Sequence, residues 1–530
     1  GPSSDPGSKL RAADVRKETK TDQNTGVSCM RLDKLLEKLE MSGLEHTLLL
    51  PENGGAEVRT EITRLVSDSR KAGHGSIFAC VIGEHSDGHD YAEKAYRSGA
   101  AALLCERRLD LPIPQIISKD IRRNMGVVAS LLYDEPAKKL KMIALTGTNG
   151  KTTSTFMTKS ILENSGIKTG LLGTVYYDDG DTAEDAEHTT PEGSDLQLWL
   201  YRMAENGCGA CVMETSSHAL VQGRLDGVLF DRGGFTNLTV DHLDFHKDME
   251  SYYRAKKMLF ERYMRNDWLA AVNIDDSYGR RLYGELGGRA VSYGTKDRSS
   301  DFFAVIKGTS AEGMDVEIRT PDSKTPVATR LPLLGEYNIL NALQAFSLCR
   351  SLGVGEEAAL EGLLRMKQVP GRLERYLIPG SGICVIDFAH SPDGLEKVLT
   401  TLRSVCRGRL AVVFGAGGDR DRTKRPIMGE IAARLADSVI ITSDNPRSED
   451  PELIVSEIEI GARKHSQEYK RIVDRKAAIF EGLKNSGPDD ILLIAGKGPE
   501  PYQILKDGPI PFLDKNVVLE WCRENGKEVI

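Results

Sequence analysis

The sequence lacks several features that would assign it to a special class of protein. No apolar run approaches the roughly 18 residues that a membrane-spanning helix needs, so no membrane segment is expected. The nine cysteines are odd in number and irregularly spaced, which predicts no disulfide framework and favours the reducing cytoplasm. Cys208 and Cys211 lack the second Cys or His pair of a zinc site, so we expect them to be buried strand residues.

The chain also lacks an excess of positive charge. It contains 70 Lys and Arg against 78 Asp and Glu, a formal net charge of −8 at pH 7. General nucleic-acid binding is therefore not expected, although a local basic pocket is compatible with this charge. Repeats of fixed period and low-complexity tracts are absent, and 40% of the 530 residues are hydrophobic. This composition is globular and offers enough length for about three to four domains.

Residues 1–29 are polar and lack the apolar core of a secretory signal peptide. Gly1-Pro2 resembles the remnant of a protease cut that removes an expression tag, and Met30 is the expected natural start. We therefore expect residues 1–29 to be a leader outside the folded domains.

Apolar strand-like runs alternate along the chain with helix-like stretches, and a polar loop follows each run. This order predicts an α/β fold with mainly parallel sheets, in which ligands bind at the carboxyl ends of the strands. Turns at 133–139 and 369–372 suggest three domains: a smaller N-terminal α/β domain at 30–138, a central domain at 139–369 and a Rossmann-like domain at 370–530. The clearest strand-like runs are residues 142–145, 210–213, 234–238, 269–273, 383–386, 410–414, 438–441 and 491–494.

The clearest chemical signal is Gly147-Thr-Asn-Gly-Lys-Thr-Thr153, between a strand-like run and a helix-like run. Glycines let backbone N–H groups approach phosphate oxygens, and the helix N-terminus favours the same anion. Lys151 would reach the terminal phosphates, and the Thr152 hydroxyl would bind Mg²⁺. The usual first glycine of a P-loop is replaced by Leu145. By itself this loop predicts a nucleoside triphosphate binder with an unknown reaction.

Acids and histidines follow two further strands. Glu214 ends a buried-looking strand, where a carboxylate is costly unless it binds a metal or a hydrogen-bond donor. Asp241-His-Leu-Asp-Phe-His246 places four polar groups within six residues. Each feature alone has an ordinary explanation, a helix cap or a solvated loop. Beside a phosphate loop they favour Mg²⁺ ligation.

These motifs together resemble the Mur ligases, the ATP-dependent amide-forming enzymes of peptidoglycan assembly, and their MurE branch in particular. The resemblance extends in order from Met30 to the C-terminus. It is carried by the phosphate loop, Met213–Arg224, Asp241–His246, Leu334–Asn338 with Asn341, Val369–Arg372, Asp387–Asp393, Gly417–Arg422, Ser443–Arg447 and Gly496–Glu500.

The resemblance implies a reaction. ATP would phosphorylate the free γ-carboxylate of UDP-N-acetylmuramoyl-L-alanyl-D-glutamate, and the amine of an amino acid would displace phosphate from the acyl phosphate. The implied small-molecule substrates are this UDP-muramoyl dipeptide and meso-diaminopimelate, and a monomer that uses ATP and Mg²⁺ is expected.

Site roles also follow from the resemblance. It implies that residues 30–138 bind UDP, that 139–369 bind ATP and that 370–530 bind the amino acid. Ser69 would contact the nucleotide sugar, beside a Gly83-x4-Gly88-His89 motif. The muramoyl-peptide contacts would be Thr189, Thr190, Ser216, Gln222 and Arg224. ATP would contact Gly147, Thr148, Asn149, Gly150, Lys151, Thr152, Thr153, Asn338, Arg372, Asp387 and His390.

The metal ligands implied are Thr152, Glu214, His242 and a carbamylated Lys256. A plain ammonium would repel Mg²⁺, whereas a carbamate offers it oxygens. Lys151, His242, Lys256 and Arg372 are the expected catalytic residues, with Arg372 stabilising charge on the transferring phosphate.

Asp444-Asn-Pro-Arg447 resembles the diaminopimelate-adding branch. Diaminopimelate differs from lysine by a distal carboxylate, which Arg447 can bind with two hydrogen bonds. Lysine has no distal carboxylate, so its binding would leave the buried guanidinium without a partner, which disfavours lysine as a substrate. Diaminopimelate would contact Arg420, Asp444, Asn445, Arg447, Gly496 and Glu500. One departure is Pro499, where the family's Gly-Lys-Gly-His-Glu motif has histidine, so no role of that histidine is carried over.

Three alternatives remain open at this stage. One is a ligase of the same architecture that adds lysine, performs another Mur step or adds glutamate to folate. Another is a non-catalytic scaffold that binds nucleotide sugars. The third is a P-loop ATPase that drives motion, which the lack of an obvious Walker B acid run disfavours.

Overall fold

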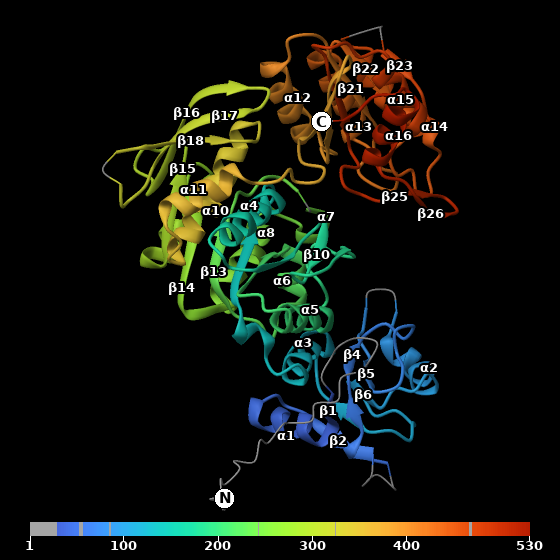
Figure 1. Cartoon of the computed structure of the whole chain (residues 1–530). Coiled ribbons are helices and arrows are strands. Elements are labelled where there is room, and N and C mark those ends of the chain that lie inside the picture. The colour runs from blue at the N-terminus through green and yellow to red at the C-terminus, as the bar shows by residue number, and fades with distance from the viewer. Residues whose placement is uncertain are drawn as a thin grey trace, which may run out of the picture. The chain divides into compact units, whose positions relative to one another are not determined.

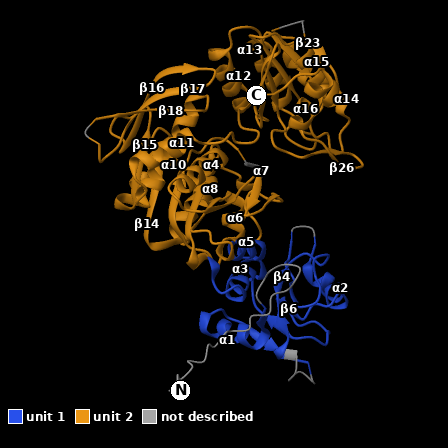
Figure 2. Ribbon diagram, viewed as in Figure 1, with its two compact units in different colours: residues 1–136, 193–202 blue, residues 137–192, 203–530 orange. Residues whose placement is uncertain are grey.

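The computed structural model describes residues 29–51, 57–83, 86–241, 243–323, 325–465 and 469–529. The chain divides into two compact units (Figure 2): unit 1 comprises residues 1–136 and 193–202, and unit 2 comprises 137–192 and 203–530. Figure 1 gives the element labels used below. No helix in the described part of the chain combines the length and apolarity needed to span a bilayer.

Unit 1 is built on a five-stranded sheet with the order β2-β7-β6-β5-β4, in which only β2 pairs antiparallel. Leucines at the spacing of one helix face bury α1, and α3 begins at the capping side chain of Asp120. Most of α5 (Gly193–Glu205) groups with this unit. Its other elements are β1 (Met30–Arg31), α1 (Leu32–Ser42), β2 (Thr47–Leu49), β3 (Glu61–Ile62), β4 (Arg64–Val66), β5 (Ser76–Ala79), α2 (Ala92–Arg97), β6 (Ala102–Cys105), β7 (Gln115–Ile117) and α3 (Ile121–Leu132).

Unit 2 contains an eleven-stranded sheet with the order β11-β10-β9-β12-β8-β13-β14-β15-β16-β17-β18. The strands from β9 to β16 in this order run parallel, and antiparallel strands flank them. They are β8 (Lys141–Thr146), β9 (Thr169–Leu172), β10 (Tyr176–Asp178), β11 (Ala183–Asp185), β12 (Ala210–Glu214), β13 (Phe230–Phe235), β14 (Met264–Asn273), β15 (Ala290–Gly294), β16 (Phe302–Ser310), β17 (Gly313–Arg319) and β18 (Val327–Leu331).

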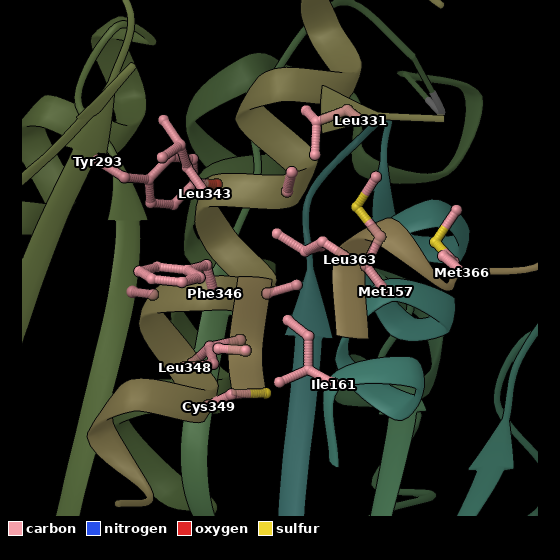
Figure 3. Packing of buried hydrophobic residues seen from close by; sticks show 14 of the residues in the cluster. Met157, Ile161, Tyr293, Leu331, Leu343, Phe346, Leu348, Cys349, Leu363 and Met366 are labelled. Carbon is pink, nitrogen blue, oxygen red and sulfur yellow. The ribbon is translucent and has the colours of Figure 1, made fainter. Parts of the chain in front are cut away.

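Helices cover both faces of this sheet. α4 (Lys151–Asn164), α10 (Glu336–Ser351) and α11 (Glu356–Leu364) share one apolar core, in which Met157 and Ile161 lie among side chains of α10 and α11 (Figure 3). A Cβ on Gly234 would meet α10, whereas one on Gly233 would meet α8 (Met249–Arg262). Since neighbouring strand residues face opposite sides, α8 covers the other face. The remaining helices here are α6 (Ser217–Gln222), α7 (Leu243–His246) and α9 (Ser277–Leu286).

The second large sheet of unit 2 has the order β19-β20-β24-β21-β22-β23, and only β19 pairs antiparallel. Alternate residues of β24 enter two different cores, one with α12, α13 and α14 and one with α15 and α16. The elements are β19 (Glu374–Ile378), β20 (Gly382–Asp387), α12 (Pro392–Val405), β21 (Leu410–Phe414), α13 (Lys424–Leu435), β22 (Ser438–Ile441), α14 (Pro451–Ala462), β23 (Tyr469–Arg471), α15 (Arg475–Lys484), β24 (Ile491–Ala495), β25 (Tyr502–Leu505), β26 (Gly508–Pro511) and α16 (Asp514–Glu524).

The predicted α/β fold with mainly parallel sheets is confirmed. The strand expected at 234–238 is displaced, because β13 ends at Phe235 and the next residues turn to contact the phosphate loop. Cys208 and Cys211 are both buried, and none of the cysteines, all of which lie in the described part of the chain, forms a disulfide.

Candidate active site

The phosphate loop connects β8 to α4 and requires glycine at two positions. Gly147 and Gly150 have φ values of 143° and 89°, which side chains with a Cβ rarely adopt. A Cβ on Gly147 would lie 1.8 Å from Thr236 Oγ1, and one on Gly150 would lie 2.3 Å from Asn341 Oδ1. The backbone of this loop is therefore closely packed and follows one path.

Asn237, which sequence reasoning did not single out, holds the loop in shape. Its carbonyl accepts from Thr148 N at 2.8 Å, and its side chain exchanges hydrogen bonds of 3.0 and 3.1 Å with the Asn149 backbone. The signal was an amide residue just after a strand that adjoins β8. Because β12, β8 and β13 are parallel neighbours, their carboxyl ends bring Glu214, the phosphate loop and Asn237 to one edge.

Two lysines converge on this loop. Lys151 Nζ donates to Gly147 O at 2.9 Å and to Thr148 O at 3.0 Å, and Lys256 Nζ donates to Gly147 O at 2.7 Å. Lys256 is only 1% exposed, and its Nζ lies 4.6 Å from the centre of the Tyr252 ring. Burial, reinforced by the charge of Lys151, lowers the pKa of Lys256 well below its usual value. Burial also lowers the pKa of Lys151.

Glu214 lies at the end of β12 and is 1% exposed. Its two carboxylate oxygens accept from Thr174 N at 2.9 Å and Thr174 Oγ1 at 3.1 Å. Its charge opposes the fall in the pKa of both Lys151 and Arg372, so these groups share one electrostatic environment. The carboxylate therefore carries negative charge into the phosphate loop's surroundings.

Of the other two predicted Mg²⁺ ligands, the structure describes Thr152 but not His242. Thr152 is buried in the first turn of α4, where Thr153 is buried too. His242 lies outside the described residues. Within the described ranges, no three His, Cys, Asp or Glu side chains form a group that could hold a metal ion. The Thr152 hydroxyl and the Glu214 carboxylate suit Mg²⁺, because Mg²⁺ prefers oxygen ligands, whereas Lys256 would offer oxygens only as the expected carbamate.

The five residues assigned to the muramoyl peptide lie together. Thr190 Oγ1 donates to Glu214 O at 2.8 Å and accepts from Ser216 N at 3.0 Å. Arg224 donates to Gln222 Oε1 at 3.0 Å and to Thr190 O at 3.0 Å, and it pairs with Glu192. Thr189 joins the group through Thr174, with 3.2 Å between the two hydroxyls. The cluster is thus continuous with the carboxyl end of β12.

Asn338 and Arg372 lie on segments that border the phosphate loop. Asn338 is buried and accepts from Asn341 Nδ2 at 2.9 Å, and Asn341 in turn packs against Gly150. Arg372 is half-buried with its guanidinium 4.8 Å from the centre of the Phe388 ring, and burial lowers its pKa. The turn that carries Arg372 is closely packed, since a Cβ on Gly371 would lie 2.3 Å from Pro499 Cδ.

Asp387 and His390 differ in how they are engaged. Asp387 is buried and accepts from Leu373 N at 2.7 Å and from Ala389 N at 2.8 Å, so both oxygens hold the turn next to Arg372. His390 is exposed, and its Nδ1 donates to Phe388 O at 2.8 Å. Direct contact of ATP with the Asp387 carboxylate would therefore have to share oxygens that already accept backbone hydrogen bonds.

The residues assigned to diaminopimelate gather at the carboxyl ends of β21, β22 and β24. Asn445 Nδ2 donates to Glu500 Oε2 at 2.8 Å, and Arg447 Nη1 donates to Gly418 O at 2.9 Å. A Cβ on Gly417 would lie near both Arg447 and Arg420, and one on Gly496 would lie 2.4 Å from Asp444 Oδ2.

Lys497 donates hydrogen bonds to residues of this cluster. It was not singled out from the sequence. It is 0% exposed, and its Nζ donates to Asn445 Oδ1 at 3.3 Å, to Glu500 Oε2 at 3.2 Å and to Tyr502 O. A lysine between glycines has no local signal of burial. Its three partners come from two loops, which only the fold brings together.

In unit 1, Ser69 is buried next to the ion pair of Asp68 and Arg70. His89 is also buried. Its Nδ1 is hydrogen-bonded to Asp87 Oδ1 at 2.6 Å, and its Nε2 accepts from Glu106 N at 3.0 Å. A Cβ on Gly88 would lie 2.5 Å from Val81 N. The Gly88-His89 pair is therefore engaged in holding its own loop.

The fold and the site define a P-loop nucleotide-binding α/β protein with an acidic and cationic cluster at the phosphate loop. The Mur ligase middle domain matches residues 145–349, the Mur ligase glutamate ligase domain matches 371–498, and the Mur ligase family catalytic domain matches 61–133. The chain belongs to the Mur ligase family.

Named relatives narrow the comparison. The chain is 42% identical over 473 residues to a UDP-N-acetylmuramoyl-L-alanyl-D-glutamate–2,6-diaminopimelate ligase 1 of Clostridium acetobutylicum, covering 88% of this chain and 96% of the relative. A ligase of the same substrate name from Clostridium botulinum is 40% identical, with 93% and 100% covered. A solved structure of such a ligase has a TM-score of 0.62 and 30% identity, with 88% and 96% covered.

Proposed function

We propose that this protein is the ATP-dependent ligase that adds meso-diaminopimelate to UDP-N-acetylmuramoyl-L-alanyl-D-glutamate in peptidoglycan precursor synthesis. The relatives described above carry the name of this activity. The observation that carries the proposal for this chain is the cluster of Arg447, Asn445 and Glu500 in the same unit as an intact phosphate loop. Such a unit can activate a carboxylate and select an amino acid.

The chemistry requires activation because a carboxylate is a poor electrophile. A γ-carboxylate oxygen of the D-glutamate unit attacks the γ-phosphorus of ATP, and ADP leaves. The diaminopimelate amine then attacks the acyl carbon, loses a proton, and the tetrahedral intermediate expels phosphate. Lys151 and Arg372 supply positive charge for the phosphate oxygens, and exclusion of water protects the acyl phosphate.

Lys256 is the residue we assign to carbamylation. Its amine is buried against the Tyr252 ring, donates to a carbonyl, and forms no ion pair with a carboxylate in the described part of the chain. An uncharged amine nitrogen can add to CO₂ and lose one proton, which gives a carbamate. With Thr152, Glu214 and His242, this carbamate would hold Mg²⁺, which supplies positive charge to the phosphate oxygens.

The pocket residues explain the choice of amino acid. Arg447 uses Nη1 for Gly418 O and Asn445 O, so its Nε and Nη2 can pair with the distal carboxylate of diaminopimelate. Glu500 Oε2 is held by Asn445 and Lys497, and Oε1 can accept from the distal ammonium. Lysine would leave the guanidinium fork without its partner, which is a strong basis for rejection.

The further assignments follow the same proposal. Residues 30–138 bind the UDP end, with Ser69 as a contact, residues 139–369 bind ATP, and residues 370–530 bind diaminopimelate. The muramoyl peptide lies along the Thr189–Arg224 cluster. A cytoplasmic location accords with nine cysteines that form no disulfide, and a monomer is part of the same proposal.

The test is phosphate release by the purified protein with ATP, Mg²⁺ and the UDP-muramoyl dipeptide. Meso-diaminopimelate and L-lysine are compared in parallel, and the mass of each product is recorded. Release and a tripeptide product with diaminopimelate alone support the proposal. Turnover with lysine alone contradicts the pocket assignment, and no turnover with either favours another acceptor or a binding scaffold.

A further inference from the structure

A fully buried ion pair lies beneath the cluster of pocket residues. Arg475 is the first residue of α15 and Asp514 the first of α16, and both side chains are 0% exposed. Arg475 Nε and Nη2 donate to the two oxygens of Asp514 at 2.8 and 2.7 Å. This bidentate geometry fixes the plane and direction of the guanidinium.

The remaining N–H groups of Arg475 reach two different loops. Nη1 donates to Ser443 O at 3.2 Å, and Nη2 donates to Ala495 O at 3.1 Å. Ser443 directly precedes Asp444, and Ala495 directly precedes Gly496. One guanidinium therefore joins the start of the 444–447 loop to the start of the 496–500 loop.

The sheet itself does not make this link. β21 lies between β22 and β24, so the two strands that carry these loops share no backbone ladder. Further along, the two loops are hydrogen-bonded to each other through Asn445, Glu500 and Lys497. These hydrogen bonds depend on the distance between the first residues of the two loops. Arg475 therefore links the two loops at their base, where the strands that carry them do not pair with each other.

Stability alone is a weak reason for such a pair. Removing two charges from water costs several kcal/mol each, and well-packed apolar side chains often stabilise a protein as well or better. The carbonyls that Arg475 binds nevertheless need donors, because they are buried at the ends of parallel strands. A buried guanidinium satisfies both carbonyls from one rigid plane.

We propose that Arg475 and Asp514 are a positioning pair for amino-acid specificity: they set the distance between Arg447 and Glu500, and hence whether the pocket can bind the distal carboxylate and the distal ammonium of diaminopimelate at the same time. This proposal rests on the proposed function. Neither residue touches the substrate. A small displacement of either loop would separate the two groups that recognise the distal carboxylate and ammonium.

The test compares Arg475→Lys and Asp514→Asn with two controls in the same helices. Lys476→Met breaks the exposed Lys476–Glu520 pair, which also joins α15 to α16. Ile479→Ala removes a buried side chain of α15 and lowers stability without touching either loop. For each variant, KM for diaminopimelate, KM for ATP, the diaminopimelate-to-lysine ratio of kcat/KM and the melting temperature are measured.

We expect both pair variants to raise KM for diaminopimelate by about tenfold or more and to lower the ratio similarly, while KM for ATP stays within about twofold. The controls should leave the ratio unchanged. The proposal is overturned if Ile479→Ala, at a matched loss of melting temperature, gives the same change, or if folded Arg475→Lys keeps the wild-type KM. Failure of both pair variants to fold, while Ile479→Ala folds, would also overturn it by showing a purely structural pair. Wild-type protein without diaminopimelate-dependent phosphate release would instead refute the proposed function.

Discussion

Replacing Arg447 by lysine tests the pocket because it keeps the charge and removes the planar fork. In the structure Nη1 donates to Gly418 O at 2.9 Å and to Asn445 O at 3.4 Å, and the other edge of the guanidinium faces no acceptor among the described residues. That edge offers two N–H groups to a carboxylate. A lysine ammonium keeps one such bond and loses the anchor to the loop.

The expected loss follows from one hydrogen bond to a charged group, which contributes about 1.5–3 kcal/mol. Since about 1.4 kcal/mol corresponds to a factor of ten, KM for diaminopimelate should rise by about 10- to 150-fold. KM for ATP should stay within about twofold, because the phosphate loop lies on the other large sheet of unit 2.

The assay is phosphate release at saturating UDP-muramoyl dipeptide, with diaminopimelate and ATP varied in turn. Arg422→Lys is the matched control, since Arg422 follows β21 as well but is 62% exposed and pairs with Glu457. It should change neither KM by more than about twofold. Equal rises in KM for both substrates, or the same rise in the control, would refute the assignment of Arg447 to the distal carboxylate.

Three further predictions follow from the same contacts. Lys256→Ala should reduce kcat about 100-fold or more, and added bicarbonate should not restore phosphate release, because no amine remains to form a carbamate. Gly353→Ala should lower the free energy of unfolding by about 1–2 kcal/mol through its positive φ, and Gly371→Ala should lower it further, because only the second Cβ meets neighbouring atoms; urea denaturation measures both. Hydrogen bonds from buried Arg425 hold the pKa of Glu449 at about 2. The stability that the charged Glu449 contributes is therefore complete above its unfolded pKa of about 4.3, and it is lost as the pH falls toward about 2. Glu449→Gln should remove about 1–3 kcal/mol at pH 7 and flatten the acid side of a stability-against-pH curve.

Each of these has a control or an outcome that contradicts it. Lys257→Ala alters a lysine that pairs with Glu261 and Glu285 and should keep most activity. Near-normal turnover of the Lys256 variant would exclude a metal-bridging carbamate. Equal destabilisation by the two glycine substitutions would show that the close contact costs nothing. An unchanged acid slope would show that Glu449 is not held in its charged form.

Much of the fold is determined locally. Short apolar runs followed by polar turns predicted the parallel strands, and the phosphate loop has glycines where its backbone takes positive φ. Because parallel strands end at the same edge, the residues after β8 and β12 could be expected to meet without coordinates. The predicted muramoyl-peptide cluster comes together for the same reason, since Thr190 and Ser216 both bind near the end of β12.

Tertiary structure alone decided the environments of the charged groups. Lys256 and Lys257 are adjacent on one helix, yet the first is buried at the phosphate loop and the second is paired at the surface. Lys497, Arg475 and Asp514 acquire their roles only when loops and helices distant in sequence pack together. The physical reason is that local sequence sets backbone conformation, whereas burial and pairing of charge depend on neighbours that are supplied by the whole fold.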